Sequence, residues 1–88
     1  ETSKKNNKRS YLKMKKVLYG KKDCTQCFLV KTMFTAMELE YEYVDIEENP
    51  EARELLVEKS FMGLPVFQVE DEFIGVVSAI QAKARELV

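Results

Sequence analysis

The fold is decided by the stretch KVLYGKKDCTQCFLVKTMF, residues 16–34. It opens with a short apolar run, Lys16–Gly20, which predicts a buried strand because the run is too brief for a helix. From Cys27 onward, apolar residues recur at the spacing of an amphipathic helix, namely at Val30, Met33, Phe34 and Met37. This spacing predicts a helix over residues 24–38. Cys24 and Cys27, the two cysteines of the chain, therefore fall where the first strand passes into the first helix.

The segments that follow predict a second strand and a second helix. Residues 41–46, YEYVDI, alternate and carry aromatic and β-branched side chains, which favour a strand. Asn49 is a preferred N-cap and Pro50 suits the first position of a helix, so a helix is expected to begin there. Its predicted buried residues are Ala52, Leu55 and Leu56.

The last part of the chain predicts a hairpin and a third helix. Residues 65–70 and 72–77 are short strand-like runs separated by an acidic turn. Ser78 is expected to cap a last helix, residues 79–87. The predicted buried residues of this helix are Ile80, Ala84 and Leu87. The whole order predicts an α/β fold with three layers, α/β/α, around a four-stranded mixed sheet.

Length, charge and hydropathy limit the number of domains and the kinds of partner to be expected. Residues 15–88 are expected to form one domain and residues 1–14 a disordered basic tail, with Met14 as a natural start ahead of the first strand. The net charge of −1 gives no overall attraction to nucleic acid or to an anionic membrane. No apolar run approaches the roughly 18 residues of a membrane span. We expect a cytoplasmic protein that binds neither nucleic acid nor membrane.

The spacing of Cys24 and Cys27 leaves three roles open: a zinc site, a structural disulfide and a reactive pair. A structural zinc ion needs four nitrogen or sulfur ligands, whereas the chain holds 2 cysteines and 0 histidines. A disulfide that closes so short a loop removes little entropy from the unfolded chain, because this effect grows with loop length. Polar and charged neighbours also fit poorly with two buried structural thiols. The reactive pair is therefore the favoured role.

The predicted helix assigns unequal roles to the two cysteines. At the helix N-terminus, Cys24 faces unpaired N–H groups and the positive end of the macrodipole, which stabilise its thiolate and lower the pKa of the thiol. Cys27 lies one turn further along and is expected to be more buried. We predict that Cys24 attacks a target disulfide as the nucleophile and that Cys27 resolves the mixed disulfide. Lys21 and Lys22 add positive charge nearby, whereas Asp23 opposes it. Thr25 and Gln26 are expected to tune the reduction potential of the pair.

The cysteine pair and three further motifs resemble the glutaredoxin family of the thioredoxin superfamily, and most of all its NrdH-redoxin branch. VLYGKKDC leads into the pair, Gln26 precedes the second cysteine as in the C-x-Q-C variant of NrdH-redoxins, NPEA opens the second helix and GLPV enters the hairpin. The resemblance covers residues 15–88 and implies a thioredoxin-like fold of the glutaredoxin type. It also implies a cis Leu64–Pro65 bond, with Pro65 beside the cysteines and the Leu64 backbone free to pair with a substrate.

The glutathione-binding residues of glutaredoxins are matched only in part. Lys21 stands where that family has a basic residue near the glutathione carboxylate, or else it is a solvated lysine. FIGVVS keeps Gly75 but has Val76 and Ser78 where glutaredoxins have a second glycine and an aspartate, and the chain lacks the tryptophan of NrdH-redoxins. Ser78 is kept as a candidate substrate contact. Three apolar residues either form a rim for a protein partner or close the core: Phe61, Met62 and Leu64.

The resemblance implies a thiol–disulfide oxidoreductase, a monomeric electron carrier that reduces protein disulfides through Cys24 and Cys27. Its reductant would be thioredoxin reductase or glutathione, with no tightly bound cofactor and no metal, and its implied target is ribonucleotide reductase. Two alternatives stay open. One is a glutathione-dependent glutaredoxin, and the other is a module in which two subunits hold an iron–sulfur cluster through Cys24 and glutathione.

Overall fold

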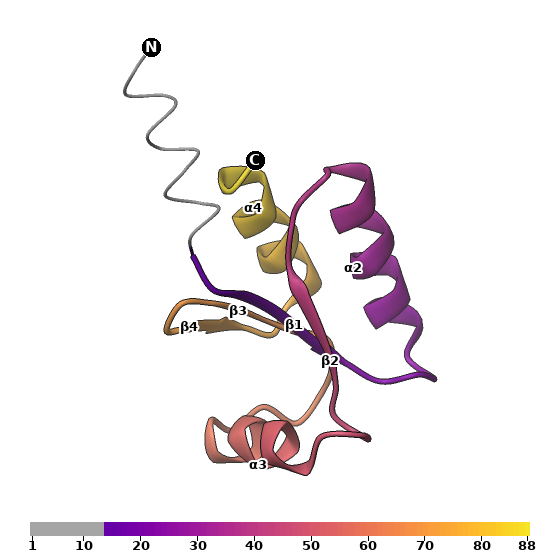
Figure 1. Ribbon diagram of the computed structural model, residues 1–88, viewed down its shortest axis with the longest axis vertical. Helices are drawn as coiled ribbons and strands as arrows, with labels where there is room; N and C mark the ends of the chain where they lie inside the picture. Colours follow the sequence, from indigo (N-terminus) through magenta and orange to yellow (C-terminus); the bar gives the residue numbers. More distant parts are fainter. Residues whose placement is uncertain (1–13) are drawn as a thin grey trace.

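The computed structural model describes residues 14–88, which form a four-stranded sheet with three helices (Figure 1). In chain order the elements are β1 Lys16–Gly20, α2 Thr25–Ala36, β2 Glu42–Asp45, α3 Pro50–Glu58, β3 Val66–Val69, β4 Glu72–Ile74 and α4 Val77–Glu86. The predicted tail lies outside the described residues except for Met14, which packs against the core. Within the described part, no helix is long and apolar enough to cross a membrane.

The sheet is mixed, as the order of elements predicted. Its strands lie in the order β2-β1-β3-β4. β1 and β2 are parallel and joined through α2, whereas β3 runs antiparallel to both β1 and β4. The register pairs Leu18 with Tyr43 on one side and with Phe67 on the other. The first strand is therefore central, and its carboxyl end delivers the chain directly to the cysteines.

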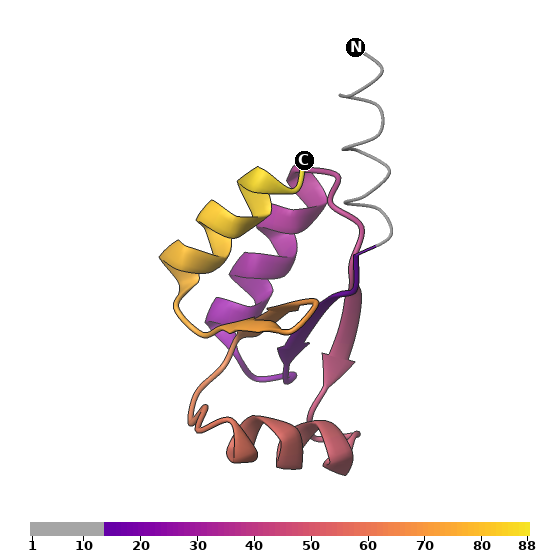
Figure 2. The same ribbon diagram turned by 90° about the vertical axis from the view of Figure 1, so that its left-hand side faces the viewer.

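Helices cover both faces of the sheet, which confirms the three-layer arrangement. Figures 1 and 2 show α2 and α4 side by side on one face and α3 alone on the other. Because side chains alternate along a strand, β1 contributes to two cores. Leu18 belongs to the core under α2 and α4, with Val30, Phe34, Phe67 and Ile80 among its fully buried partners. Val17 and Tyr19 belong to the core under α3, with Ala52, Leu56 and Val66.

The start of α3 matches its sequence signals. Asn49 is the N-cap, its side-chain oxygen accepts the Ala52 N–H at 3.2 Å, and Pro50 opens the helix. Ala52 and Leu56 are buried and Leu55 is half-buried, as expected from their spacing. The second helix of the chain is therefore predicted correctly in both its start and its buried face.

The start of α4 corrects one prediction. Ser78 is not the N-cap: the helix begins at Val77, Val76 occupies the cap position without a side-chain hydrogen bond, and Ser78 is exposed. The physical reason is that Val77 packs against the core under α2 and α4, so it continues the buried stripe of the helix. For the same reason β4 ends at Ile74 instead of running to residue 77. The predicted buried residues Ile80, Ala84 and Leu87 are all confirmed.

Candidate active site at the Cys24–Cys27 pair

Cys24 and Cys27 lie at the start of α2, just beyond the carboxyl end of β1. Cys24 is the N-cap of the helix and Cys27 lies in its first turn. The two form a disulfide, and their Cα atoms are 5.2 Å apart. The Cys24 Sγ also accepts a hydrogen bond from the Cys27 backbone N–H at 3.1 Å. One N–H group of the helix end is therefore aimed at the sulfur of the first cysteine, as the sequence predicted.

The two sulfur atoms differ in how much solvent they meet. Cys27 is 1% exposed, whereas Cys24 is half-buried. An external thiol or disulfide can therefore reach Cys24 and not Cys27. This difference agrees with the predicted roles of Cys24 as nucleophile and Cys27 as resolving residue.

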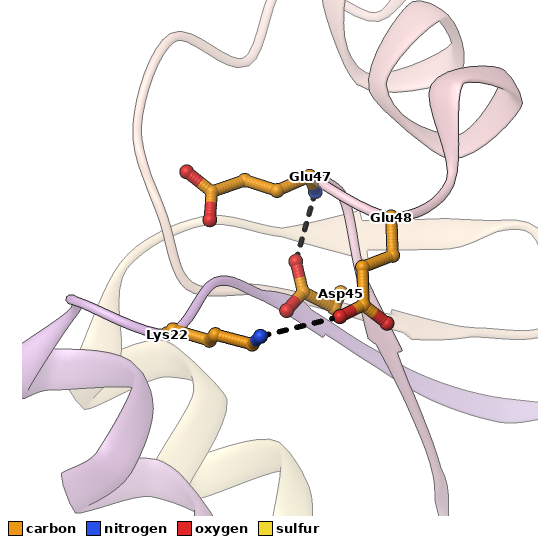
Figure 3. A network of polar contacts seen from close by, with 4 residues as sticks. All are labelled: Lys22, Asp45, Glu47 and Glu48. Atoms are coloured by element: carbon orange, nitrogen blue, oxygen red, sulfur yellow. Dashed lines mark hydrogen bonds and ion pairs between the residues drawn. The ribbon is translucent and has the colours of Figure 1, made fainter.

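The helix N-terminus and nearby lysines favour a negatively charged sulfur at Cys24. α2 has no acidic residue in its first turn, although Asp23, which directly precedes Cys24, places one negative charge beside the helix end. Lys21 and Lys22 are both exposed in the loop that leads into the helix. Lys22 forms an ion pair with Glu48 at 3.4 Å (Figure 3). The charge of Lys22 is thereby partly balanced, whereas Lys21 lines both cavities that contain Cys24 and can face a thiolate or an anionic ligand there.

Figure 3 also shows how the acidic segment after β2 is arranged. Asp45 Oδ1 accepts the backbone N–H of Glu47 at 2.8 Å, which fixes the turn that follows the strand. This turn presents Glu48 toward Lys22 across the gap between the end of β2 and the loop before α2. The contact ties the cysteine loop to the segment that leads into α3.

An apolar cavity of about 520 Å³ opens beside Cys24. Four charged residues line it, namely Lys21 and Asp23 from the cysteine loop, Glu47 after β2 and Arg53 of α3, and Ile46 lines it as well. Its apolar wall comes from α3 and the loop that follows: Leu56, Val57, Phe61, Met62 and Leu64. The side chain of Met62 is 96% exposed. The predicted apolar rim and Cys24 are thus brought together around one cavity.

Phe61 serves both of the roles that the sequence left open. It lines the cavity beside Cys24, and it also packs against Phe73 with ring centroids 6.2 Å apart. Its ring edge covers Gly75 so closely that a Cβ at this glycine would stand 2.8 Å from Phe61 Cε1. The space that a side chain at residue 75 would need is therefore filled by the Phe61 ring.

The Leu64–Pro65 peptide bond is cis, as the family resemblance implied. Pro65 is fully buried, and Leu64 lines the cavity that also contains Cys24. The segment that leads into β3 therefore lines the same cavity as Cys24. Pairing of the Leu64 backbone with a substrate stays a prediction.

A second cavity, of about 500 Å³, lies on the other side of the pair. Both cysteines line it, together with Phe28, Lys31 and Tyr43. The Lys31 amine lies 4.1 Å from the centroid of the Tyr43 ring. Sequence reasoning placed none of these three at the site. The available signal was the strand alternation of residues 41–46, which shows that Tyr43 shares a face with Tyr41, but not that this face leads to the cysteines.

Four predicted contact residues, Thr25, Gln26, Pro65 and Ser78, line neither cavity that contains Cys24. Thr25 and Gln26 are exposed on the first turn of α2 and line neither of the two cavities that contain Cys24. Ser78 lies in the first turn of α4 and is also absent from both linings. Lys21, in contrast, lines both cavities, as its predicted position beside Cys24 requires.

The glutaredoxin family model matches residues 17–74, which span β1 to β4 and include both cysteines. Two curated relatives are the glutaredoxin-like proteins NrdH of Lactococcus lactis subsp. lactis (strain IL1403) and of Lactococcus lactis subsp. cremoris (strain MG1363). Each is 33% identical over 54 residues, which make up 61% of this chain and 75% of the relative.

Solved structures agree with this family. The NrdH-redoxin of Escherichia coli superposes with a TM-score of 0.71 at 27% identity, over 78% of this chain and 93% of the other. A glutaredoxin of Brucella melitensis, at 20% identity and a TM-score of 0.65 over 82% of this chain and 79% of the other, supports the fold alone. With the family model covering most of the chain and both cysteines joined at the start of α2, the chain belongs to the glutaredoxin family and is a thiol–disulfide oxidoreductase.

Proposed function

We propose that this chain is a dithiol electron carrier of the NrdH-redoxin type, which takes electrons from thioredoxin reductase and delivers them to a disulfide of ribonucleotide reductase. It would act as a monomer. It would work in the cytoplasm, because a cysteine pair that must be reduced again after each cycle needs a reducing compartment. The observation that carries this proposal is the apolar cavity beside Cys24.

The lining of this cavity favours a protein over a small polar thiol as the substrate. Val57 and Met62 present apolar side chains that are 65% and 96% exposed, and Phe61 and Leu64 lie beside them. Exposed apolar side chains gathered at a groove are typical of surfaces that bind other proteins. A target segment could place apolar residues there while its disulfide meets Cys24.

The chemistry needs only the two cysteines. The Cys24 thiolate attacks one sulfur of the target disulfide, forming a mixed disulfide and releasing the other target sulfur as a thiolate. Cys27 then loses its proton and attacks Cys24 Sγ, which breaks the mixed disulfide and releases the reduced target. The Cys24–Cys27 disulfide remains and is reduced by the electron donor.

The relatives support the choice of branch. Both curated relatives carry the name NrdH, and the Escherichia coli protein is described as having a thioredoxin-like activity profile. Gln26 gives this chain the C-x-Q-C pattern that resembles NrdH-redoxins. In addition, the ring of Phe61 occupies the space that a Cβ at Gly75 would take.

A glutathione-dependent glutaredoxin is the second candidate. It is favoured by Lys21, which is exposed and lines both cavities beside Cys24, where an amine can pair with a carboxylate of a small thiol. This candidate differs from the first in the electron donor and not in the roles of the cysteines.

The test is insulin disulfide reduction with two electron sources in parallel. One contains NADPH and thioredoxin reductase, and the other contains NADPH, glutathione and glutathione reductase. Turnover with the first source alone supports the proposal, and turnover with the second alone supports the glutathione-dependent candidate. A protein that is purified with bound iron and glutathione would favour the cluster-binding alternative. Reconstitution with ribonucleotide reductase then tests the target.

A pair of surface variants tests the apolar cavity itself. Met62→Asp places a charge in the rim, while Val88→Asp places one on a similarly exposed apolar residue outside both cavities that contain Cys24. We expect Met62→Asp to raise the KM for a protein disulfide several-fold, with reduction of the pair by dithiothreitol unchanged. Equal KM values for the two variants would contradict binding through this rim.

A further inference from the structure

The hydroxyl of Tyr43 and the sulfur of Cys27 share a small space above Gly20. A Cβ added at Gly20 would stand 2.9 Å from Tyr43 Oη and 3.1 Å from Cys27 Sγ. The two atoms thus approach the same point from β2 and from α2, and both residues line the cavity of about 500 Å³. Only a residue without a side chain leaves this space open. Gly20, at the end of β1, provides it.

The Tyr43 hydroxyl is available as a hydrogen-bond donor. Among the described residues it has no hydrogen-bond partner, and its ring is held by the Lys31 amine at 4.1 Å and by packing against the core under α2 and α4. Burial raises the pKa of Tyr43, and the nearby acids Asp45, Glu47 and Glu48 raise it further, as does Tyr41. The phenol therefore keeps its proton at neutral pH and can donate it.

Cys27 needs such a donor when the disulfide is reduced. A thiolate can reach Cys24 but not Cys27, because Cys27 is 1% exposed. When the bond breaks, the electron pair therefore falls on a sulfur that water hardly touches, and a buried charge without a partner is costly. The chain holds no histidine to supply a proton.

We propose that the Tyr43 hydroxyl donates a hydrogen bond to the Cys27 sulfur and stabilises it as the leaving thiolate. A reductant thiolate attacks Cys24 Sγ, a new S–S bond joins the two, the Cys24–Cys27 bond breaks, and its electron pair goes to Cys27 Sγ. Tyr43 Oη–H holds that charge until a proton from water converts the thiolate to a thiol. This inference rests on dithiol exchange at the pair and not on the identity of the physiological reductant or target.

Other charges face the same cavity and must be held constant in any test. They are Lys31 from α2, Lys21 and Lys22 from the preceding loop, Asp45 from β2 and Glu48 after it. Lys22 and Glu48 pair with each other, and Lys31 contacts the ring of Tyr43 and not its hydroxyl. Replacing tyrosine by phenylalanine keeps the ring and every one of these charges. It therefore isolates the hydroxyl.

Tyr43→Phe is the test variant, and Tyr41→Phe is its matched control. Tyr41 is also half-buried and packs against the same core, but it lies two residues earlier and lines neither of the cavities that contain Cys24. The first measurement is the ionisation of Cys27 in a Cys24→Ala background, followed by thiolate absorbance near 240 nm. We expect Tyr43→Phe to raise the midpoint by about one pH unit or more, because hydrogen bonds to charged groups contribute at least that much.

The second measurement is the rate at which dithiothreitol reduces the Cys24–Cys27 disulfide of the full chain. Tyr43→Phe should slow this step about tenfold at neutral pH, which is the rate equivalent of one pH unit. Tyr41→Phe should match the parent protein in both measurements. Far-UV circular dichroism checks that each variant is folded.

The proposal is overturned if folded Tyr43→Phe keeps the parent midpoint and rate, or if Tyr41→Phe shifts them equally. Should Tyr43→Phe fail to fold, Gly20→Ala provides a second variant, since its methyl group separates the hydroxyl from the sulfur. An unchanged midpoint in Gly20→Ala would overturn the proposal as well. Because dithiothreitol is the reductant, these results do not depend on whether thioredoxin reductase or glutathione serves the protein.

Discussion

Gly75→Ala is expected to destabilise the protein through a contact with one aromatic ring. An added Cβ at residue 75 would stand 2.8 Å from Phe61 Cε1 and 2.9 Å from Phe61 Cδ1, distances at which one of the groups must move. The ring is held on its other side by Phe73, at a centroid distance of 6.2 Å. The shift of Phe61 therefore carries with it the apolar wall of the cavity beside Cys24.

The size of the effect follows from two opposing contributions. No glycine in the described part of the chain has a positive φ, so alanine fits the backbone at residue 75. Without a clash it would stabilise the fold by about 0.4–1 kcal/mol, because it restricts the unfolded chain. Overpacking against a held side chain costs about 1–3 kcal/mol. The net expectation is a loss of up to about 2.6 kcal/mol in the free energy of unfolding.

A double-mutant cycle with Phe61→Ala separates the two contributions. Once the ring is gone, Gly75→Ala meets no clash and should become neutral or stabilising. The coupling free energy should therefore be about 1–3 kcal/mol, within the range seen for residues in contact. Urea unfolding followed by circular dichroism gives each free energy. Gly63→Ala is the control, because nothing lies within 4 Å of the position of its Cβ.

The same variants connect stability to substrate recognition. Gly75→Ala should raise the KM for a protein disulfide, since it displaces Phe61, which lines the cavity beside Cys24. Gly63 lines the same cavity, so Gly63→Ala is a control for stability only. If Gly75→Ala costs the same with and without the Phe61 ring, the contact does not explain this glycine. The absence of a side chain at residue 75 would then need an explanation other than the Phe61 ring.

Three further outcomes are expected. Asn49→Ala removes the oxygen that accepts the Ala52 N–H and should lower the free energy of unfolding by about 1 kcal/mol, whereas Asn49→Asp should keep most of it; equal loss in both would contradict the cap. Cys27→Ser should stop the reaction at the mixed disulfide, so that a covalent adduct with the target accumulates on a non-reducing gel; an equal amount of adduct with Cys24→Ser would reverse the assigned roles. Finally, burial raises the pKa of three tyrosines above the ordinary value of 10.0, so the folded protein holds their protons more tightly than the unfolded chain does. Their contribution to stability is complete below pH 10.0 and is lost as the pH rises through the raised pKa values. Denaturant midpoints measured up to about pH 11 should therefore fall as the pH rises. Midpoints that rise with pH above 10.0 would refute this direction. The tyrosines are Tyr19, Tyr41 and Tyr43.

Much of the fold could be predicted because its signals are local. The apolar run of β1, the helical spacing after Cys27 and the Asn49–Pro50 start each lie within a few residues, and each was confirmed. The start of α4 was misplaced because Val76 and Val77 are β-branched and favour a strand on propensity alone. The spacing of Val77 with Ile80 and Ala84 was the better signal, since all three face the same core.

The surroundings of the cysteines were harder to predict, because they depend on strand register and loop path. That Tyr43 Oη and Cys27 Sγ both lie close to Gly20 depends on the pairing of β1 with β2, in which Leu18 lies opposite Tyr43. The sequence patterns indicate that each segment is a strand, but they do not specify how the two strands are aligned. Similarly, the close approach of the Phe61 ring to Gly75 joins residues that lie in different loops of the chain. The unequal exposure of the two cysteines could be predicted, because it depends only on where they lie at the start of one helix.

The redox-active cysteines and the proposed recognition surface belong to different segments of the chain. Both sulfur atoms lie at the start of α2, whereas the apolar rim comes from residues 61–64, after α3. The two segments meet only in the folded protein. A few substitutions in this loop can therefore change which partner is bound while the sulfur chemistry is left intact. Duplicated copies of such a carrier can diverge toward new targets by evolving one short loop, without having to invent the reaction again.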